Sequence, residues 1–260
     1  MKRTIYHLPL YIFISLLLFS INEVKSQSMT AAEIIKKADE KQRGKSSKGN
    51  FTMIIERSSW SRSITMKSWS KGDDYFLILI TSPAKEKGQV FLKREKEIWN
   101  WIPSIERMVK IPPSMMMQSW MGSDFTNDDL VKQSSIVDDY RAKLIGEEMI
   151  RDKMCYKIEL IPNEDAPVVW EKIITWILKG SYDQWKAEYY DEDQKLVNSE
   201  NSFDIKKMGD RSIPTRIEII PENKKNQKTI FIINSIEYNN PISDSFFTQQ
   251  QMKRIGLTEK

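Results

Sequence analysis

The sequence predicts a mainly β protein (α+β), in which a single curved antiparallel sheet forms an unclosed β-barrel with an N-terminal helix and a short helical lid over the concave face. Three observations predict this fold. About a dozen short segments alternate between apolar and polar residues, most of the loops between them have hairpin length, and one methionine-rich segment interrupts the series. A sheet of this many strands has to flatten or leave a cavity, so we expect helical material on its concave face.

The first 26 residues have the organisation of a cleavable secretory signal peptide. Lys2 and Arg3 form a basic start, residues 8–21 are an apolar stretch too short to span a bilayer comfortably, and Val24 and Ser26 suit a signal-peptidase site. An uncleaved membrane anchor is the alternative. Because no cysteine lies near the cut, the acyl anchor of a bacterial lipoprotein is excluded. We expect a soluble, exported monomer.

The N-terminal helix is expected over residues 29–44. Thr30 or Ser28 can cap it, and Glu33 follows Thr30 at the spacing of a capping box. An apolar stripe predicts the face that packs on the sheet, and a glycine marks the end of the helix. The stripe consists of Ile34, Ile35 and Ala38, and the glycine is Gly44.

The strands follow with period-two alternation, which is typical of half-buried sheets. Turn residues such as Gly, Pro, Asp and Ser separate them. The predicted strands are 51–58, 61–69, 74–81, 88–94, 97–103, 106–112, 134–146, 153–162, 170–179, 185–191, 195–207, 213–220 and 229–238.

The C-terminal tail, ISDSFFTQQQMKRIG, predicts a loop that runs into a short helix. Residues 27–260 are expected to form one domain. Two separate sandwiches with a break near residue 130 are the alternative, but the composition there is not that of a linker.

Residues 114–130, SMMMQSWMGSDFTNDDL, are the candidate lid, and five of the thirteen methionines lie between 108 and 121. Methionine is unbranched and polarisable, so it can repack around ligands of varied shape. Apolar residues at 116, 117, 120 and 121 also fit a helical stripe of permanent core, and both readings stay open. The candidate ligand and lid residues are Met115, Met116, Met117, Trp120, Met121 and Phe125.

Three tryptophans are candidates for the wall of a ligand cavity. Trp99 and Trp101 share one face of their strand, and Trp69 is expected on the concave face as well, although large aromatic residues also fill barrel interiors as plain core. Gly122 and Asp124 are expected to shape the turn after the lid, with Asp124 capping the following turn.

The composition excludes several function classes. Of 40 basic and 36 acidic residues, the signal contributes three and one, which leaves 37 against 35 and a net charge near +2, without the basic footprint of a nucleic-acid binder. His7 is the sole histidine and leaves with the signal, and Cys155, a predicted buried residue, is the sole cysteine. Catalytic triads, most zinc sites and disulfides are therefore excluded, and no P-loop is present. We expect no enzyme, no cofactor and no metal.

The acidic pairs along the chain are expected to be solvated turn or strand residues rather than a hydrolase site. A weak calcium site at 191–193 is conceivable, but it lacks a full oxygen-rich loop.

Residues 121–130, MGSDFTNDDL, resemble the G-[ST]-D-F-x-x-x-D-L element of the LolA-like superfamily of outer-membrane lipoprotein-sorting proteins. They follow the proline-flanked stretch 99–113, as in that family. Residues 186–197 resemble its hairpin with an acidic turn, and residues 213–248 are similar to its C-terminal strand pair and closing loop. The resemblance covers nearly all of the mature chain.

This resemblance implies an unclosed β-barrel with helices over its mouth, a periplasmic location and the binding of lipid-modified or hydrophobic ligands. The expected function is therefore a periplasmic carrier or chaperone for lipoproteins, lipids or another hydrophobic ligand. The alternative is an accessory periplasmic subunit of an inner-membrane exporter of the RND or MMPL type, because the Gly-Ser-Asp-Phe version resembles a branch associated with efflux-type transporters.

Overall fold

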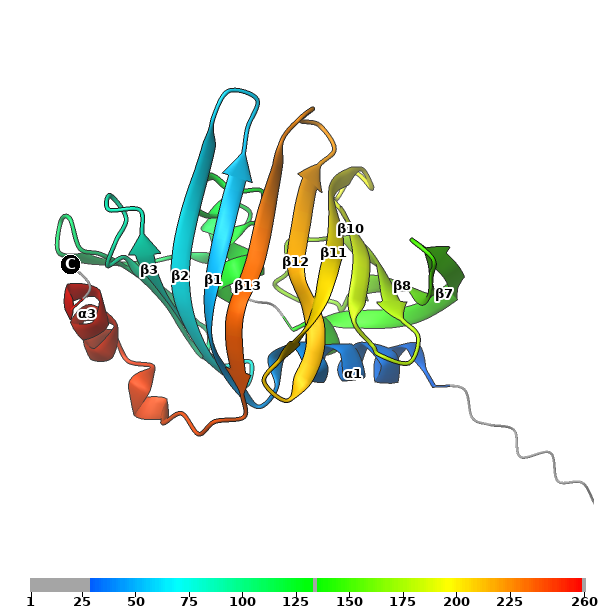
Figure 1. Ribbon diagram of the computed structural model, residues 1–260, viewed down its shortest axis with the longest axis horizontal. Helices are drawn as coiled ribbons and strands as arrows, with labels where there is room; N and C mark the ends of the chain where they lie inside the picture. The colour runs from blue at the N-terminus through cyan, green and yellow to red at the C-terminus, as the bar shows by residue number, and fades with distance from the viewer. Residues whose placement is uncertain (1–28, 133–134, 259–260) are drawn as a thin grey trace, which may run out of the picture.

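The computed structural model describes residues 29–132 and 135–258, so the predicted signal peptide lies outside the described residues. Within them, thirteen strands form one antiparallel sheet in the order β6-β5-β4-β3-β2-β1-β13-β12-β11-β10-β9-β8-β7 (Figure 1). The predicted single, curved and unclosed sheet is confirmed. No helix in the described part of the chain is long and apolar enough to cross a membrane.

The observed strands correspond one to one with the predicted segments. They are β1 (Ser46–Glu56), β2 (Ser61–Lys71), β3 (Tyr75–Ser82), β4 (Val90–Arg94), β5 (Glu97–Ile102), β6 (Arg107–Lys110), β7 (Tyr140–Ile150), β8 (Lys153–Pro162), β9 (Lys172–Leu178), β10 (Gln184–Tyr190), β11 (Leu196–Met208), β12 (Arg211–Pro221) and β13 (Lys228–Tyr238).

The helical elements are short. They are α1 (Ala31–Arg43), the 3₁₀ turns η1 (Pro113–Met115) and η2 (Trp120–Gly122), the π-helical turn η3 (Asp128–Lys132), α2 (Ile136–Asp139), the 3₁₀ turn η4 (Asp244–Phe246) and α3 (Gln249–Thr258).

Helix α1 begins as predicted. Thr30 accepts a hydrogen bond from the Glu33 backbone N–H at 3.3 Å, and the Glu33 carboxylate accepts one from the Thr30 N–H at 2.8 Å, which completes the capping box. Ile34 and Ile35 are buried against the sheet. At the other end, Gly44 has φ of +65°, a conformation that favours glycine and stops the helix.

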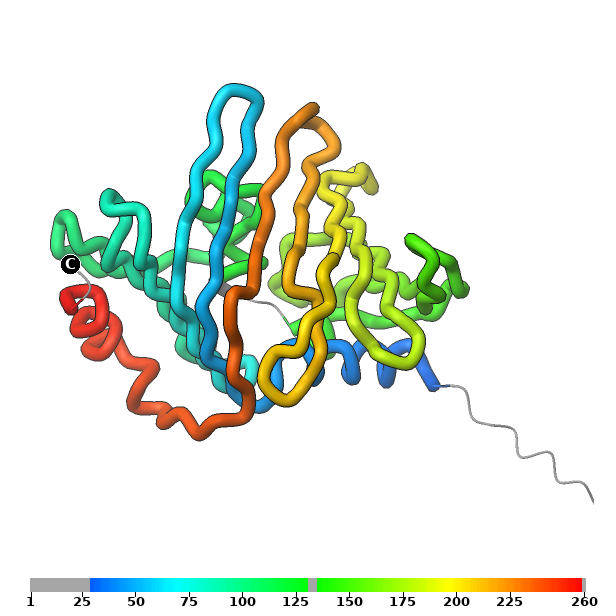
Figure 2. The backbone as a smooth tube through the Cα atoms, viewed as in Figure 1, coloured from blue at the N-terminus to red at the C-terminus, as the bar shows by residue number. Residues whose placement is uncertain are grey.

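The strand order explains why one segment of the chain crosses a face of the sheet. Strands β6 and β7 are consecutive in the sequence but form the two opposite edges of the sheet, so the chain between them has to cross one face. That connection includes residues 113–132, which we call the cross-sheet segment, and it lies behind β1, β2 and β13 in the view of Figure 2. We call the face that bears this segment and α1 the inner face.

Two apolar clusters divide the inner face. Under the cross-sheet segment, side chains of β1–β5, together with some from β12 and β13, pack against it and form what we call the sealed half, with Met53, Ile64 and Ile80 among its buried residues. Under α1, side chains of β8–β10 form the second cluster, which includes Ile158 and Leu160. We call the inner face of β8–β12 the hollow half.

The outer face carries α3. Phe247 and Met252 from the C-terminal tail are fully buried against β3–β5, so the predicted loop and helix are confirmed as a cover for this face. Figure 1 shows α3 beside β3, at the opposite end of the sheet from α1. On the outer face of β8–β10, Cys155 is buried among Ile174 and Trp176, as expected for a small hydrophobic residue.

Two predicted strand starts are wrong by at least five residues. Strand β1 begins at Ser46 rather than at residue 51. The strand expected from residue 134 begins at Tyr140, because residues 136–139 form α2 instead. The Ser135 hydroxyl accepts a hydrogen bond from the Asp138 N–H at 3.1 Å, so it acts as the N-cap of this turn.

Candidate functional site

The cross-sheet segment fills the sealed half with its own side chains. Trp120 is 1% exposed and lies 5.3 Å from the ring of Phe91 between centroids. Met116 and Phe125 are buried in the same cluster, while Met115 and Met121 are partly buried against it. These contacts have the character of permanent core.

The predicted helical stripe through residues 116, 117, 120 and 121 is wrong. Two short 3₁₀ turns replace one helix, and Met121 has φ of +51°, which breaks the helical path. As a result, Met117 is 56% exposed rather than packed toward a ligand.

Asp124 anchors the cross-sheet segment to the sheet. Its carboxylate accepts hydrogen bonds from both terminal nitrogens of Arg57, at 2.9 and 3.1 Å, and from the Thr229 hydroxyl at 2.7 Å. Its backbone N–H donates to Thr229 Oγ1, and its carbonyl accepts from the Asn198 amide. Because its side chain is 1% exposed, this bidentate pair is shielded from water.

The expectation that Asp124 caps the following turn is therefore wrong. Thr126 and Asp129 cap it together: the Thr126 hydroxyl accepts from the Asp129 N–H at 3.1 Å, and the Asp129 carboxylate accepts from the Thr126 N–H at 2.7 Å. Gly122 has φ of +79°, as its predicted role in the turn requires.

The three tryptophans expected in the cavity wall lie on the outer face. Trp101 is buried in the cluster that α3 covers, and Trp69 and Trp99 are partly buried against it. Strand alternation is the reason: Ile98 faces the cross-sheet segment, so Trp99 and Trp101 have to face the other way. Their assignment to the cavity wall is wrong.

A cavity of about 320 Å³ occupies the hollow half. Helix α1 covers it with Ile35 and Ala38, strand β9 contributes Ile173 and Ile177, and Phe125 reaches it from the cross-sheet segment. Of the six predicted lid residues, Phe125 lines this cavity, as does Asp124 from the predicted turn.

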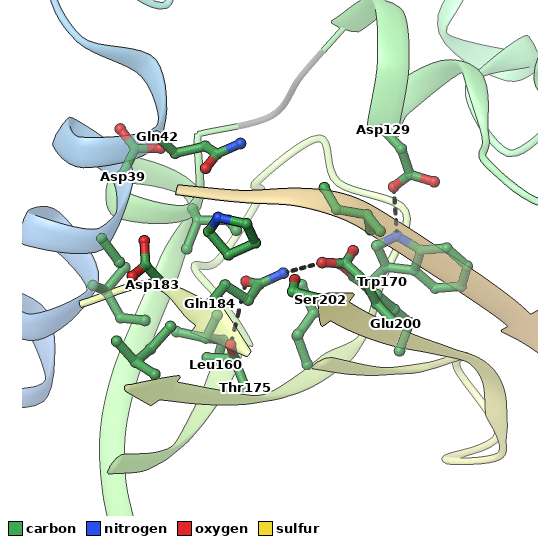
Figure 3. Close-up of a pocket in the computed structure, with 18 of the residues that line it drawn as sticks. Asp39, Gln42, Asp129, Leu160, Trp170, Thr175, Asp183, Gln184, Glu200 and Ser202 are labelled. Carbon is green, nitrogen blue, oxygen red and sulfur yellow. Dashed lines mark hydrogen bonds between the residues drawn. The ribbon is translucent and has the colours of Figure 1, made fainter. Parts of the chain in front are cut away.

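The floor of the cavity is a hydrogen-bonded network around Glu200 of β11 (Figure 3). One carboxyl oxygen of Glu200 accepts from the Gln184 amide at 2.5 Å, and the other accepts from the Tyr189 hydroxyl at 2.9 Å. Glu200 is 8% exposed, and burial raises the pKa of its carboxyl above the ordinary value.

Asp129 forms a second buried carboxyl at the same cavity. It accepts a hydrogen bond from the indole N–H of Trp170 at 3.0 Å, and the Trp170 ring lies 5.3 Å from the ring of Tyr189. Burial raises the pKa of the Asp129 carboxyl, and the charge of Asp129 in turn raises the pKa of Glu200 further.

The polar floor was not predicted from the sequence, although a signal for it exists. In β11, Asn198, Glu200 and Ser202 alternate on the inner face, where the neighbouring strand β12 places Ile217 and Ile219. A central strand with polar residues at the core positions is unusual and indicates an interior that supplies hydrogen-bond partners, such as a cavity.

The remaining acidic candidates have local partners. The Asp191 carboxylate accepts from the backbone N–H groups of Asp193 and Lys195, so it closes its own turn. In residues 29–132 and 135–258, no group of three or more His, Cys, Asp or Glu side chains is arranged to hold a metal ion.

Comparison with known proteins identifies the family of this chain. A family model described as "Uncharacterized protein" matches residues 72–254. The chain belongs to that family. No curated protein matches it.

Solved structures share its fold over nearly their whole length. A DUF1329 family protein from Desulfovibrio piger has a TM-score of 0.78 at 22% identity, covering 85% of this chain and 97% of its own. A LolA superfamily protein from Nitrosomonas europaea has a TM-score of 0.75 at 23% identity, covering 86% and 99%.

A domain from Vibrio parahaemolyticus, assigned as an outer-membrane lipoprotein-sorting protein, has a TM-score of 0.77 at 20% identity, covering 86% and 98%. The resemblance to the LolA-like superfamily is thus confirmed at the level of the fold. The chain shares the fold of these three structures.

Proposed function

We propose that this protein is a periplasmic carrier that binds the apolar part of a lipid, a lipoprotein or another amphiphile in the cavity of the hollow half. The observation that carries the proposal is the cavity itself: a space of about 320 Å³ that the cross-sheet segment leaves unfilled although it fills the sealed half. The fold shared with a lipoprotein-sorting domain supports it.

The size of the cavity limits what it can hold. Ligand pockets span about 300–1,000 Å³, so this one suits a single small ligand or one acyl chain rather than a bundle of chains. Each buried methylene contributes about 0.8 kcal/mol, so transfer of one long chain from water gains roughly 10 kcal/mol. That gain is enough for a carrier function without nucleotide hydrolysis.

Helix α1 is the cover that such a ligand has to pass. Polar contacts hold it near its C-terminal end: Lys41 pairs with Asp183 at 2.6 Å, and Arg211 donates to the Lys41 carbonyl at 2.8 Å. The cross-sheet segment is instead fixed by buried aromatic packing and by Asp124. We therefore assign the displaceable cover to α1 rather than to the methionine-rich residues.

Filling the cavity tests the proposal. Ala38→Phe places a ring where α1 faces the cavity, and we expect it to lower the affinity for a single-chain amphiphile at least about tenfold, because ligand and ring compete for the same space. Ala32→Phe, on the exposed side of the same helix, is the matched control and keeps the affinity of the original protein.

The measurement is native mass spectrometry of both variants and the original protein, each purified from its own cell envelope, followed by organic extraction of what is bound. A co-purifying amphiphile that Ala38→Phe loses and Ala32→Phe retains supports the carrier function. An original protein that carries no extractable ligand, binds no added amphiphile and co-purifies with a membrane transporter would instead favour the accessory-subunit alternative.

A further inference from the structure

The carboxyl groups around the cavity differ in how their charge is balanced. Asp124 is paired with Arg57, Asp183 with Lys41, and Asp39 with Arg43 at 2.6 Å. Asp129 and Glu200 form no ion pair with any cation in the described residues, and their hydrogen-bond donors are neutral amide, indole and hydroxyl groups. The protein thus concentrates carboxyl acceptors at this wall without a cation of its own, and a bound cation would favour their ionised form.

Ser202 adds an independent observation. Its side chain lines the cavity next to Glu200, two residues further along the inner face of β11 (Figure 3). The residue is 2% exposed, and its hydroxyl forms no hydrogen bond with the other cavity-lining residues drawn in Figure 3. Buried hydroxyl groups are normally hydrogen-bonded, so an unused one at a cavity wall indicates that the cavity supplies its partner.

We propose that the cavity selects an amphiphile with a cationic, N–H-donating head group, such as a primary ammonium, which pairs with Glu200 and Ser202 while its apolar chain lies against Ile173, Ile177 and α1. This inference rests on the proposed carrier function and names the class of its ligand. An ammonium offers three donors and one positive charge, which matches the acceptor-rich and uncompensated wall.

An anionic head group fits this wall poorly. A carboxylate or phosphate would lie near Asp129 and Glu200, and like charges in a shielded site repel strongly. A neutral alcohol could donate one hydrogen bond but would gain no charge pairing. The expected order of affinity for equal chains is therefore ammonium, then alcohol, then carboxylate.

The purely structural reading is that Glu200 serves only to hold Gln184 and Tyr189 in place. Glu200→Gln separates the two readings because glutamine can keep both contacts: its carbonyl oxygen accepts from Gln184, and its NH₂ donates to the Tyr189 oxygen. Glu188→Gln is the matched control. Glu188 lies on the neighbouring strand β10, pairs with Lys186, and is not part of the cavity wall.

The experiment is isothermal titration of the purified protein with decylammonium, 1-decanol and decanoate below their aggregation limits at neutral pH. We expect decylammonium to bind at least about tenfold more tightly than decanol, and Glu200→Gln to remove most of that preference while decanol binding stays within about twofold. Glu188→Gln keeps the preference. Thermal unfolding of each variant checks that it is folded.

The outcomes separate the two proposals. Equal affinity for the three ligands, preference for decanoate, or an ammonium preference that survives in Glu200→Gln would overturn the inference and leave the carrier function standing. If none of the three ligands binds the original protein, and Ala38→Phe changes nothing in the envelope-purified material, the carrier function is overturned as well.

Discussion

The sealed half and the hollow half of the inner face are built from the same sheet but are completed in different ways. Over β1–β5, the cross-sheet segment inserts Met116, Trp120 and Phe125 and is pinned by Asp124. Over β8–β12, a single helix covers the strands and leaves a cavity with buried carboxyl groups. The methionine-rich segment therefore stabilises the fold, while the binding chemistry belongs to the other half.

Truncating the sealed half gives the largest expected effect. Trp120→Ala should lower the free energy of unfolding by about 3–5 kcal/mol, because it removes a fully buried indole and leaves a cavity between β4 and the cross-sheet segment. Denaturant unfolding measures it. Met117→Ala, three residues earlier but exposed, should change stability by less than about 0.5 kcal/mol. Equal effects of the two substitutions would contradict the division into halves.

Loss of the Asp124–Arg57 ion pair, which holds the cross-sheet segment on the sheet, has the second-largest expected effect on stability. Asp124→Ala leaves the Arg57 guanidinium without its carboxylate in a shielded position, which should cost about 3 kcal/mol of stability. Lys224→Ala removes a more distant and half-exposed cation, 3.9 Å from the same carboxylate, and should cost less than about 0.5 kcal/mol. Chemical denaturation of both variants compares them, and an Asp124→Ala protein as stable as Lys224→Ala would show that the anchor is dispensable.

The hollow half has the smaller, pH-dependent effect. Because burial raises the pKa of Glu200, the folded state holds its proton more tightly than the unfolded state. Its favourable contribution is complete below the ordinary glutamate pKa and is lost as the pH rises through the raised value. Glu200→Gln lacks this loss, so its stability relative to the original protein should increase as the pH rises.

Unfolding free energies of both proteins between about pH 4 and pH 8 test this slope. The charge of Asp129 also raises the pKa of Glu200, so the difference between the two proteins includes this repulsion, which has the same sign as the effect of burial. A stability difference that stays constant with pH, or that shrinks as the pH rises, would show that the Glu200 carboxyl is not desolvated in the folded protein.

Local patterns in the sequence predict the sheet well. Alternation identifies the strands, and the capping box at Thr30 and Glu33 defines the start of α1. These features depend on residues close in the chain. The same holds for Gly122, whose turn requires a positive φ.

The errors concern contacts between distant residues. Strand β3 buries both of its faces, with Leu77 and Leu79 outward and Ile78 and Ile80 inward, so alternation cannot tell which face is the inner one. The partner that decides it for Trp101 is α3, about 150 residues later in the chain.

The cavity could not be predicted from the sequence for a related reason. It exists because no side chain fills the space above Thr175 and Glu200, and a sequence pattern shows which groups are apolar but not which space they leave empty. The methionine-rich segment is conspicuous in composition, but composition does not show whether its side chains are free to contact a ligand. Its side chains already have partners in the sealed half.

Photochemical labelling tests the central claim most directly. A ten-carbon alcohol with a diazirine at the end of its chain is bound, irradiated and mapped by peptide mass spectrometry. We predict labels on residues 35–42 of α1 and on the cavity-lining parts of β9 and β11, with labelling suppressed in Ala38→Phe. Labels concentrated on residues 113–121, or around Trp99 and Trp101 on the outer face, would contradict the account.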